Sequence, residues 1–472
     1  MRALAVVLVV ACGGRGGDVP PPAKKDGGVP DAPVLDIQAR TLGMPDLGSY
    51  MWRKRGGHPA FRIARTAEAK NAWADVVTTC KQALTADPGH LEAAWLLAAG
   101  LGKLGKTDEL LAPLHLAVAG DLGKWGHASL ELPELQAFLK TPHGQAWQRR
   151  IETDRVAYIA ALARSVIVAS AGDLYAFDPE AKRWYRVTRT FGAVVGALRV
   201  EPTKIAYVTR QRSAQRRSGD DRGKATLAIG IVDLARGKTS RPIELGTKGP
   251  VIVTYSAKTD PGIWIGNGTG WKRLDDNYNL VSLSAPPKTR PPGPWLEVKN
   301  RTARVRALPV AGVTADWDDK GLASAIRIGK SNRVVSVPAP GLIDGNTAAW
   351  SPDRSRIAFV AQLDDTCAPN AVNAAAFVAD ATTGTITEIE RAESMAIEWI
   401  SDRKLMIDKG GGVMVFDLDG APPAPLEGAD GLLHPRRRPT CTPIPPEDVP
   451  QEPDPADGSG EPSTDAMVEP PG

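Results

Sequence analysis

The stretch Trp350-Ser351-Pro352-Asp353-Arg354-Ser355-Arg356-Ile357-Ala358-Phe359-Val360 joins a polar turn to a short apolar run. Proline and aspartate are typical of tight turns, and a short apolar run directly after a turn is typical of a buried strand. Looser copies of this pattern occur as VEPTKIAYVTR, YSAKTDPGIWI, DWDDKGLASAIRI and EWISDRKLMI. A turn-and-strand unit that recurs along the chain predicts a repeat architecture built from β-strands.

A second repeated element is an apolar run that ends in aspartate before a short polar turn. It occurs at LYAFD (Asp178), AIGIVD (Asp233), AFVAD (Asp380) and VMVFD (Asp417), with looser versions in IWIGNGTGWKRL and SAIRIGKSNRVVSV. We expect each aspartate to accept hydrogen bonds from backbone amides about two residues further on, which would fix a hairpin. Tryptophans also recur at corresponding points and are expected to pack between units: Trp317, Trp350 and Trp399.

These elements resemble the repeat of TolB-like β-propellers, which are distant relatives of WD40 repeats. Residues 348–362 carry the resemblance most clearly, and residues 245–340 carry it least. Counted with the opening ARSVIVAS, the units number about six at a mean spacing of roughly 48 residues, which suits four strands per blade. The resemblance implies an all-β six-bladed propeller over residues 153–432. In that arrangement Ser351-Pro352-Asp353 forms the loop between the outer strand of one blade and the inner strand of the next.

Residues 57–120 have a helical period instead. The stretches FRIARTAEAKNAWADVVTTCKQALTADP and HLEAAWLLAAGLGKLGKTDELLAPLHLAVA resemble two consecutive tetratricopeptide repeats, because small or apolar residues fall at the positions that this motif needs. Residues 131–151 have apolar side chains at helical spacing and are expected to supply a capping hairpin. We therefore expect a tetratricopeptide-like helical domain over residues 49–152 and an α+β multidomain chain.

Residues 100–107 match the P-loop expression GxxxxGK[ST]. Phosphate binding by such a loop requires a strand before it and a helix after it. Leu91 to Ala99 are rich in alanine and leucine and contain no β-branched residue, which favours helix. We therefore expect the glycines to form a turn between two helices, and we predict no nucleotide partner.

The chain begins with Met1-Arg2, an apolar run and Cys12. This start resembles a bacterial lipoprotein signal peptide, in which Val9-Val10-Ala11-Cys12 matches the lipobox. The resemblance implies removal of residues 1–11 and lipidation of Cys12. It also implies a lipid-anchored protein of the cell envelope. Gly13 after the cysteine favours the outer membrane, with the protein facing the periplasm.

Two segments are expected to be disordered, a tether at residues 12–48 and a tail rich in proline and acidic residues at 433–472, because both are poor in large apolar side chains. Arg436-Arg437-Arg438 at the start of the tail is interpreted as a solvated linker, with contact to anionic lipid as the alternative. The whole chain has 58 basic and 54 acidic residues, a net charge of +4, which gives no nucleic-acid footprint.

The four cysteines have different surroundings. Cys80 lies inside a helical pattern, whereas Cys367 and Cys441 lie in polar, turn-rich segments. In an oxidising envelope compartment Cys367 and Cys441 are candidates for a disulfide. Two unrelated free thiols are the alternative interpretation.

The sequence shows no GxSxG, HExxH or paired CxxC motif. Two calcium-like strings, which begin at Asp275 and Asp316, depart from the ligand pattern of an EF-hand loop. All six histidines lie outside the predicted propeller: His58, His90, His115, His127, His143 and His434. We therefore predict a protein that is not an enzyme and uses no catalytic residue, cofactor or metal.

These observations predict a membrane-anchored envelope lipoprotein that acts as a non-catalytic scaffold. Its partners would be unidentified envelope proteins, bound by the helical groove and the propeller mouth. One alternative is a propeller that binds or cleaves an envelope carbohydrate, which clustered carboxylates of raised pKa at the channel mouth would favour. Another is a cytosolic repeat scaffold, which retention of Met1 in the mature protein would favour.

The lipid anchor can be tested by the substitution Cys12→Ala. Without the thiol no diacylglycerol is attached, so the variant should move from the membrane pellet to the soluble periplasm or keep an uncleaved signal. Fractionation and mass measurement of the amino terminus would report both outcomes. Membrane retention equal to that of the natural chain would contradict lipidation.

Overall fold

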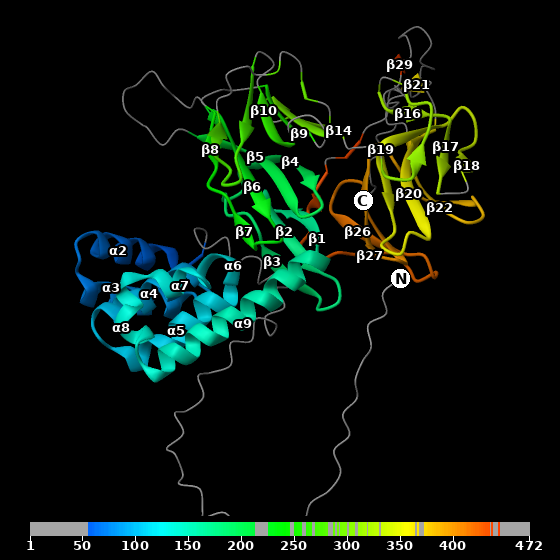
Figure 1. Ribbon diagram of the computed structural model, residues 1–472. Coiled ribbons are helices and arrows are strands. Elements are labelled where there is room, and N and C mark those ends of the chain that lie inside the picture. Colours follow the sequence, from blue (N-terminus) through cyan, green and yellow to red (C-terminus); the bar gives the residue numbers. More distant parts are fainter. Residues whose placement is uncertain are drawn as a thin grey trace, which may run out of the picture.

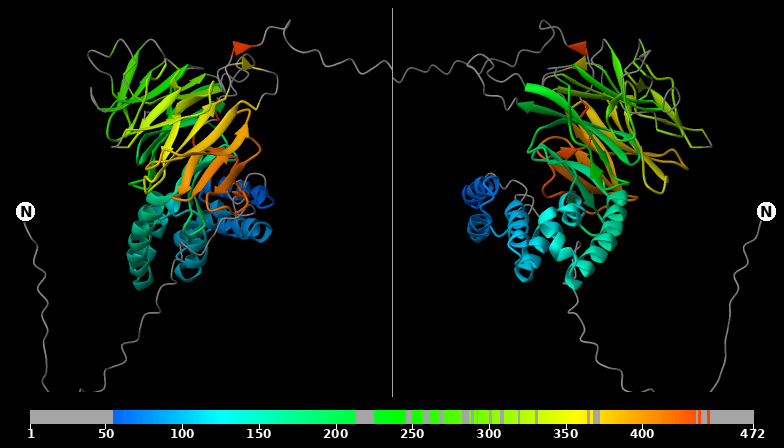
Figure 2. Two further views of the ribbon diagram at one scale, coloured as in Figure 1. Left: turned by 90° about the vertical axis from the view of Figure 1, so that its right-hand side faces the viewer. Right: turned by 60° about the vertical axis from the view of Figure 1, so that its left-hand side comes forward.

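The chain folds into a helical region followed by an all-β region. The computed structural model describes residues 55–437 and 442–443, except 213–224, 246–249, 257–260, 267–269, 282–286, 288–289, 292, 300–301, 307–309, 319, 330–331, 364–365, 368–371 and 435. Helices occupy the described chain up to Arg164, and strands begin at Val166. Figure 1 shows the helices, blue to cyan, at one end and the sheets at the other, and Figure 2 shows the same division from two further sides. The predicted α+β order is confirmed.

Two consecutive helix hairpins open the helical region. They are α2 (His58–Ala69) with α3 (Trp73–Ala86), and α4 (Leu91–Lys103) with α5 (Thr107–Gly120). Their facing sides are packed with small and apolar side chains, among them the buried Cys80. The P-loop match therefore joins two helices, as expected. Its Gly105 has a φ of +71°, which suits a residue without a Cβ.

Shorter helices and one long helix complete this region. They are α6 (Leu122–Trp125), α7 (Ala128–Glu131), the 3-10 turn η2 (Pro133–Leu135), α8 (Gln136–Leu139) and α9 (Pro142–Arg164). Thr141 caps α9, because its hydroxyl accepts a hydrogen bond from the Gly144 amide at 3.1 Å. The helical region thus continues to Arg164 rather than ending near 152. None of the described helices is long and apolar enough to cross a membrane.

The described residues form six sheets of three or more strands, and most strands of each sheet come from one stretch of the chain. The first sheet contains β1 (Val166–Ser170), β2 (Asp173–Asp178), β3 (Arg183–Arg186) and β28 (Gly431–Leu432). The second contains β4 (Val194–Glu201), β5 (Lys204–Arg212), β6 (Ala225–Asp233), β7 (Lys238–Thr239) and β8 (Ile243–Glu244). The third contains β9 (Val251–Ser256), β10 (Gly262–Gly266), β11 (Trp271–Leu274), β12 (Leu280–Val281), β13 (Trp295–Lys299) and β14 (Thr302–Arg306).

The remaining sheets lie in the second half of the β region. The fourth contains β15 (Val313–Thr314), β17 (Ala325–Ile328) and β18 (Arg333–Ser336). The fifth contains β16 (Leu322–Ala323), β19 (Leu342–Trp350), β20 (Arg356–Gln362), β22 (Ala374–Asp380) and β23 (Ile386–Ala392). The sixth contains β24 (Ala396–Ser401), β25 (Lys404–Asp408), β26 (Val413–Asp417) and β27 (Ala424–Pro425). The described strands form separate sheets and not one closed sheet.

The last strand of the β region completes the first sheet. β28 pairs antiparallel with β1, with Leu432 opposite Val168 and Gly431 opposite Ala169. The third sheet departs from a simple repeat, because the hairpin β13–β14 continues it beyond β9 and contacts β4 of the second sheet. This irregular sheet lies in the part of the sequence where the repeat is weakest.

The repeated aspartates form the predicted turns. In each case the carboxylate accepts hydrogen bonds from backbone amides two or three residues further on: Asp178 from Glu180 at 3.1 Å, Asp233 from Arg236 at 3.0 Å, Asp380 from Thr382 at 2.8 Å and Asp417 from Asp419 at 2.9 Å. The expected packing of tryptophans between units is confirmed for Trp399 and Trp350. Trp399 donates to the carbonyl of Ala349 in the fifth sheet at 2.8 Å, and Trp350 donates to the carbonyl of Ala311 at 2.9 Å.

The expectation for Ser351-Pro352-Asp353 is wrong. These residues join β19 to β20, which are neighbouring strands of the same sheet, and therefore do not connect two sheets. Hydrogen bonds from Ser351 and Ser355 lower the pKa of Asp353 to about 2. The Asp353 amide donates to the carboxylate of Asp402 at 2.8 Å, so the turn contacts the sixth sheet through a hydrogen bond.

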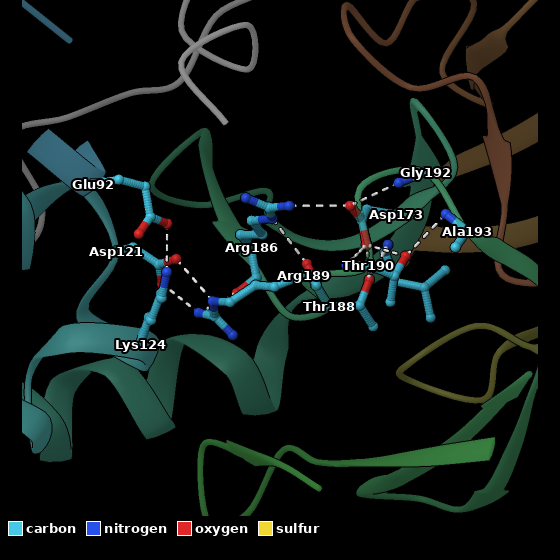
Figure 3. Close-up of polar contacts among 11 residues, drawn as sticks. Glu92, Asp121, Lys124, Asp173, Arg186, Thr188, Arg189, Thr190, Gly192 and Ala193 are labelled. Carbon is cyan, nitrogen blue, oxygen red and sulfur yellow. Dashed lines mark hydrogen bonds and ion pairs between the residues drawn. The ribbon is translucent and has the colours of Figure 1, made fainter. Parts of the chain in front are cut away.

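One hydrophobic cluster joins the helices to the β region. It runs from Phe61 in α2 through Leu162 in α9 to Ile167 in β1 and Val232 in β6. At its edge, Arg189 donates from Nε to Oδ2 of Asp121 at 2.9 Å and from Nη2 to Oδ1 (Figure 3). The helical region is therefore fastened to the loop after the first sheet by shared apolar packing and by a two-point ion pair.

Asp173 organises the loop that carries Arg189. Its carboxylate is 1 % exposed and accepts hydrogen bonds from Thr188 Oγ1, from Thr190 Oγ1 and from the Thr190 amide, each at 2.8 Å. The buried guanidinium of Arg186 donates to the same carboxylate at 3.1 Å (Figure 3). Asp173 thus satisfies several buried donors at once.

We expect Asp173→Asn to destabilise the protein by about 3 kcal/mol, because it leaves the Arg186 charge buried without its partner. The exposed pair Arg403–Asp419 is a matched control, since Asp419 is 60 % exposed and Asp419→Asn should cost less than about 1 kcal/mol. Urea unfolding followed by tryptophan fluorescence would compare the two variants. Equal decreases in the free energy of unfolding for the two variants would show that Asp173 has no special structural role.

Two cysteines singled out from the sequence, Cys12 and Cys441, are outside the described residues. β21 (Thr366–Cys367) pairs in parallel with β29 (Thr442–Pro443), with Cys367 opposite Pro443. The chain after the sixth sheet therefore returns to the segment between β20 and β22. The Cys367–Cys441 disulfide stays a prediction.

Thiol counting on the denatured, unreduced mature protein should find Cys80 as the one reactive thiol. The substitution Cys367→Ser should then make Cys441 reactive as well. It should also lower stability by up to roughly 4 kcal/mol, because a bridge that closes a loop of about 75 residues restricts the unfolded chain. Three reactive thiols in the natural sequence would exclude the bridge.

Candidate functional site

A cavity of about 180 Å³ lies where several sheets meet in the β region. Three of the strands that line it, β4, β19 and β24, come early in the second, fifth and sixth sheets, and β14 and the chain after β28 add further residues. Its lining is Arg199, Val305, Val310, Asn346, Thr347, Ala348, Ala349, Ala396, Ile397, Glu398, Leu432, Leu433, His434 and Arg437. Charged, polar and apolar side chains therefore converge on one partly open space.

Strand irregularities position two parts of this lining. The register of β4 on β5 shifts between Arg199 and Glu201, and the register of β19 on β20 shifts between Asp344 and Ala349. In the second case Thr347 holds the distorted backbone, because its hydroxyl donates to the Asp344 carbonyl at 2.7 Å and accepts from the Val360 amide at 2.8 Å. Such bulges redirect side chains that a regular strand would place on the ladder.

Arg199 and Glu398 form a loose charge pair in the cavity. Nη2 of Arg199 lies 3.8 Å from Oε1 of Glu398, and the two side chains are 29 % and 26 % exposed. Nη1 of Arg199 donates to the Pro202 carbonyl at 2.8 Å. Burial raises the pKa of Glu398, and the charge of Arg199 only partly opposes this shift. Glu398 therefore keeps its proton to a higher pH than an ordinary glutamate does.

Arg437 is paired more tightly. Its Nε donates to Oδ2 of Asp344 at 2.9 Å, and its Nη1 donates to the Val305 carbonyl at 3.3 Å. Its backbone exchanges hydrogen bonds with Met395, the residue before β24. The interpretation of Arg437 as part of a solvated linker is therefore wrong, because Asp344 and the edge of the sixth sheet hold it in place.

His434 also lines the cavity, so the expectation that all six histidines lie outside the predicted propeller does not hold for this residue. Burial, together with the nearby charge of Arg199, lowers the pKa of His434 to about 4. Its imidazole is neutral at neutral pH and offers one donor and one acceptor. His434 was not predicted as a site residue from the sequence, because it follows the short strand β28 and directly precedes the proline-rich tail.

The cavity is suited to binding a small polar group. Asp344 already accepts hydrogen bonds from Arg437 and from the side-chain amide of Asn346, the latter at 2.8 Å. The other carboxyl group at the cavity is Glu398, whose pKa is raised. Among the described residues, no group of three or more His, Cys, Asp or Glu side chains is arranged to hold a metal ion. Of the sequence-predicted site residues, Cys12 and Cys441 are outside the described chain and Cys367 lies in β21, whereas the cavity residues were not predicted.

Comparison with known proteins gives distant likenesses. No family model matches the chain, and no curated protein matches it. A puromycin-hydrolyzing peptidase of Mycobacterium tuberculosis is 12 % identical over 56 % of this chain and 43 % of its own, with a TM-score of 0.25. A eukaryotic initiation factor is 12 % identical over 58 % of this chain and 87 % of its own, with a TM-score of 0.25. The isopeptidase AtxE2 is 9 % identical over 55 % and 37 %, with a TM-score of 0.14.

The matched part of this chain thus spans less than half the length of either peptidase. All three TM-scores are below 0.5, so the description of the β region rests on its own strand pairing.

The depressed pKa of His434 predicts a loss of stability in acid. As the pH falls from about 6.5 to about 4, the unfolded chain binds a proton at His434 and the folded chain does not. The stability that neutral His434 contributes is present above pH 6.5 and is lost through this window, with a slope of at most about 1.4 kcal/mol per pH unit. Glu398 contributes the opposite slope, because its raised pKa favours the folded state at low pH.

The comparison is therefore made in the Glu398→Gln background, with and without His434→Asn. Urea midpoints measured between pH 7 and pH 4 should fall more steeply when His434 is present. Parallel curves for the two proteins would show that His434 titrates normally in the fold.

Proposed function

We propose that the β region is a six-bladed TolB-like propeller and that the whole chain is a lipid-anchored, non-catalytic scaffold of the cell envelope. In this proposal Cys12 carries the lipid, and the helical region resembles tetratricopeptide repeats. Both regions bind envelope proteins. The scaffold would most simply face the periplasm from the outer membrane.

Three features of the strands support the propeller. Most strands of each of the six sheets come from one stretch of the chain, strands early in three sheets reach one cavity, and the pairing of β28 with β1 joins the end of the β region to its beginning. Propeller blades are separate sheets around a central channel, so separate sheets agree with this arrangement. The hairpin β13–β14, which contacts β4, would then lie on the channel side of the third blade.

The junction between the two regions is the observation that carries the scaffold proposal. The continuous hydrophobic cluster and the two-point contact of Arg189 with Asp121 join the helices to the first two sheets. Domains joined by a small polar interface usually move relative to one another, whereas a large apolar interface holds them together. A scaffold gains from this, because two binding surfaces held in a fixed relation bind one assembly with less loss of entropy.

The carbohydrate alternative is less well supported by the cavity. Cleavage of a glycosidic bond requires two carboxyl groups that flank the bond. At this cavity Asp344 already accepts hydrogen bonds from Arg437 and Asn346, and Glu398 faces Arg199. The lining of the cavity therefore supports binding of a ligand better than cleavage of a carbohydrate.

The scaffold proposal is tested by affinity capture from detergent-solubilised envelope with the tagged full chain. The natural chain should enrich a defined set of envelope proteins over an untagged preparation. Arg189→Ala should reduce that capture several-fold, because it loosens the helices from the β region, whereas Arg403→Ala, which removes an exposed arginine, should not.

Circular dichroism would first establish that Arg189→Ala remains folded. Absence of any enriched protein would refute the scaffold. Equal capture by Arg189→Ala and the natural chain would refute the role of a fixed junction.

A further inference from the structure

The lining of the cavity combines charge with apolar surface. Arg199 and Arg437 supply two guanidinium groups, and Val305, Ala348 and Leu432 are among the apolar residues beside them. A ligand that satisfies both needs a charged or strongly polar head and a short apolar body. The charges of the lining and the size of the space further restrict the class of ligand.

Arg199 keeps hydrogen-bonding capacity for a ligand. Within the described chain its side chain donates one hydrogen bond, to the Pro202 carbonyl, and its contact with Glu398 at 3.8 Å is longer than a hydrogen bond. A guanidinium carries five N–H donors in a planar fork that matches a carboxylate. A ligand carboxylate beside Arg199 would therefore accept hydrogen bonds that Arg199 does not donate to Glu398.

The balance of charge favours an anion. The positive charge of Arg437 is matched by Asp344 at 2.9 Å. The counter-charge of Arg199 is Glu398, whose pKa is raised by burial, and His434 beside them is neutral. When Glu398 holds its proton, these groups leave one positive charge without an anionic partner.

The size of the space suits a group of a few heavy atoms. A cavity of about 150 Å³ in another protein holds a benzene ring, and a water molecule takes about 30 Å³ of liquid volume. A space of about 180 Å³ therefore fits a carboxylate on a chain of a few carbons, or the terminal residue of a peptide.

We infer that the cavity binds a carboxylate carried on a short apolar chain, and that Arg199 is its principal donor. This inference depends on the local geometry of the cavity and does not rest on the scaffold proposal. The carboxylate belongs either to a small free acid or to the carboxyl terminus of a peptide, and the same arginine would recognise both.

The first experiment uses butyrate as the probe and butyramide as its uncharged control. Ring signals of His434, assigned by their loss in His434→Asn, would be followed by NMR during titration of the full chain. Butyrate should shift these signals saturably and bind at least about tenfold more tightly than butyramide, because only the carboxylate makes charge-assisted bonds. Equal binding of the two probes, or no binding of butyrate, would overturn the inference.

Variants separate a direct role of Arg199 from a structural one. Arg199→Gln should weaken butyrate binding about tenfold and leave butyramide unchanged, whereas Arg403→Gln should change neither. Glu398→Gln should keep or strengthen butyrate binding, because it removes the carboxylate that competes for Arg199 whenever Glu398 is ionised. A purely structural role for these residues predicts weaker binding in both cavity variants, so a loss of butyrate binding in Glu398→Gln would also overturn the inference.

The source of the carboxylate is decided by a second pair of probes. An acetylated tripeptide that ends in valine is compared with its carboxyl-terminal amide and with butyrate. Tighter binding of the peptide acid than of butyrate identifies a peptide terminus as the ligand, and the reverse order identifies a free acid. Equal binding of the peptide acid and its amide would show that Arg199 does not recognise a peptide carboxylate.

Discussion

The β region depends on the pairing of β28 with β1. Through it a two-residue strand, Gly431–Leu432, becomes the fourth strand of the first sheet and leads the following residues to the cavity. His434 lines that cavity, and Arg437 pairs with Met395 and Asp344 on two other sheets. Loss of this short strand would therefore remove part of the first sheet and part of the candidate site together.

A second constraint in the first sheet is a buried charged group, Asp173, at the start of β2. Asp173 is nearly fully buried and accepts hydrogen bonds from the loop after β3, and Arg189 on that loop donates to Asp121 of the helical region. Exposed ion pairs contribute little to the free energy of unfolding. Buried ion pairs with satisfied hydrogen bonds favour a single geometry, and removal of one partner strongly destabilises the fold. Local loop structure thus fixes how two regions meet.

Local features of the sequence predicted local structure well. The turns at Asp178 and Asp380 and the contact of Trp399 follow from interactions that recur with the repeat. The cavity was not predictable in this way, because Arg437 and Asp344 are 93 residues apart and neither lies in a motif. The hairpin β13–β14 was also missed, since it pairs with β9 in the part of the sequence where the repeat is weakest.

The position of β28 has a consequence for how the protein is made. The first sheet of the β region cannot be completed until residue 432 has left the ribosome, so this sheet waits for nearly the whole chain. Contacts between such distant residues form slowly and leave strand edges exposed in the meantime. Chaperones that hold unfolded chains would protect β1 until its partner arrives.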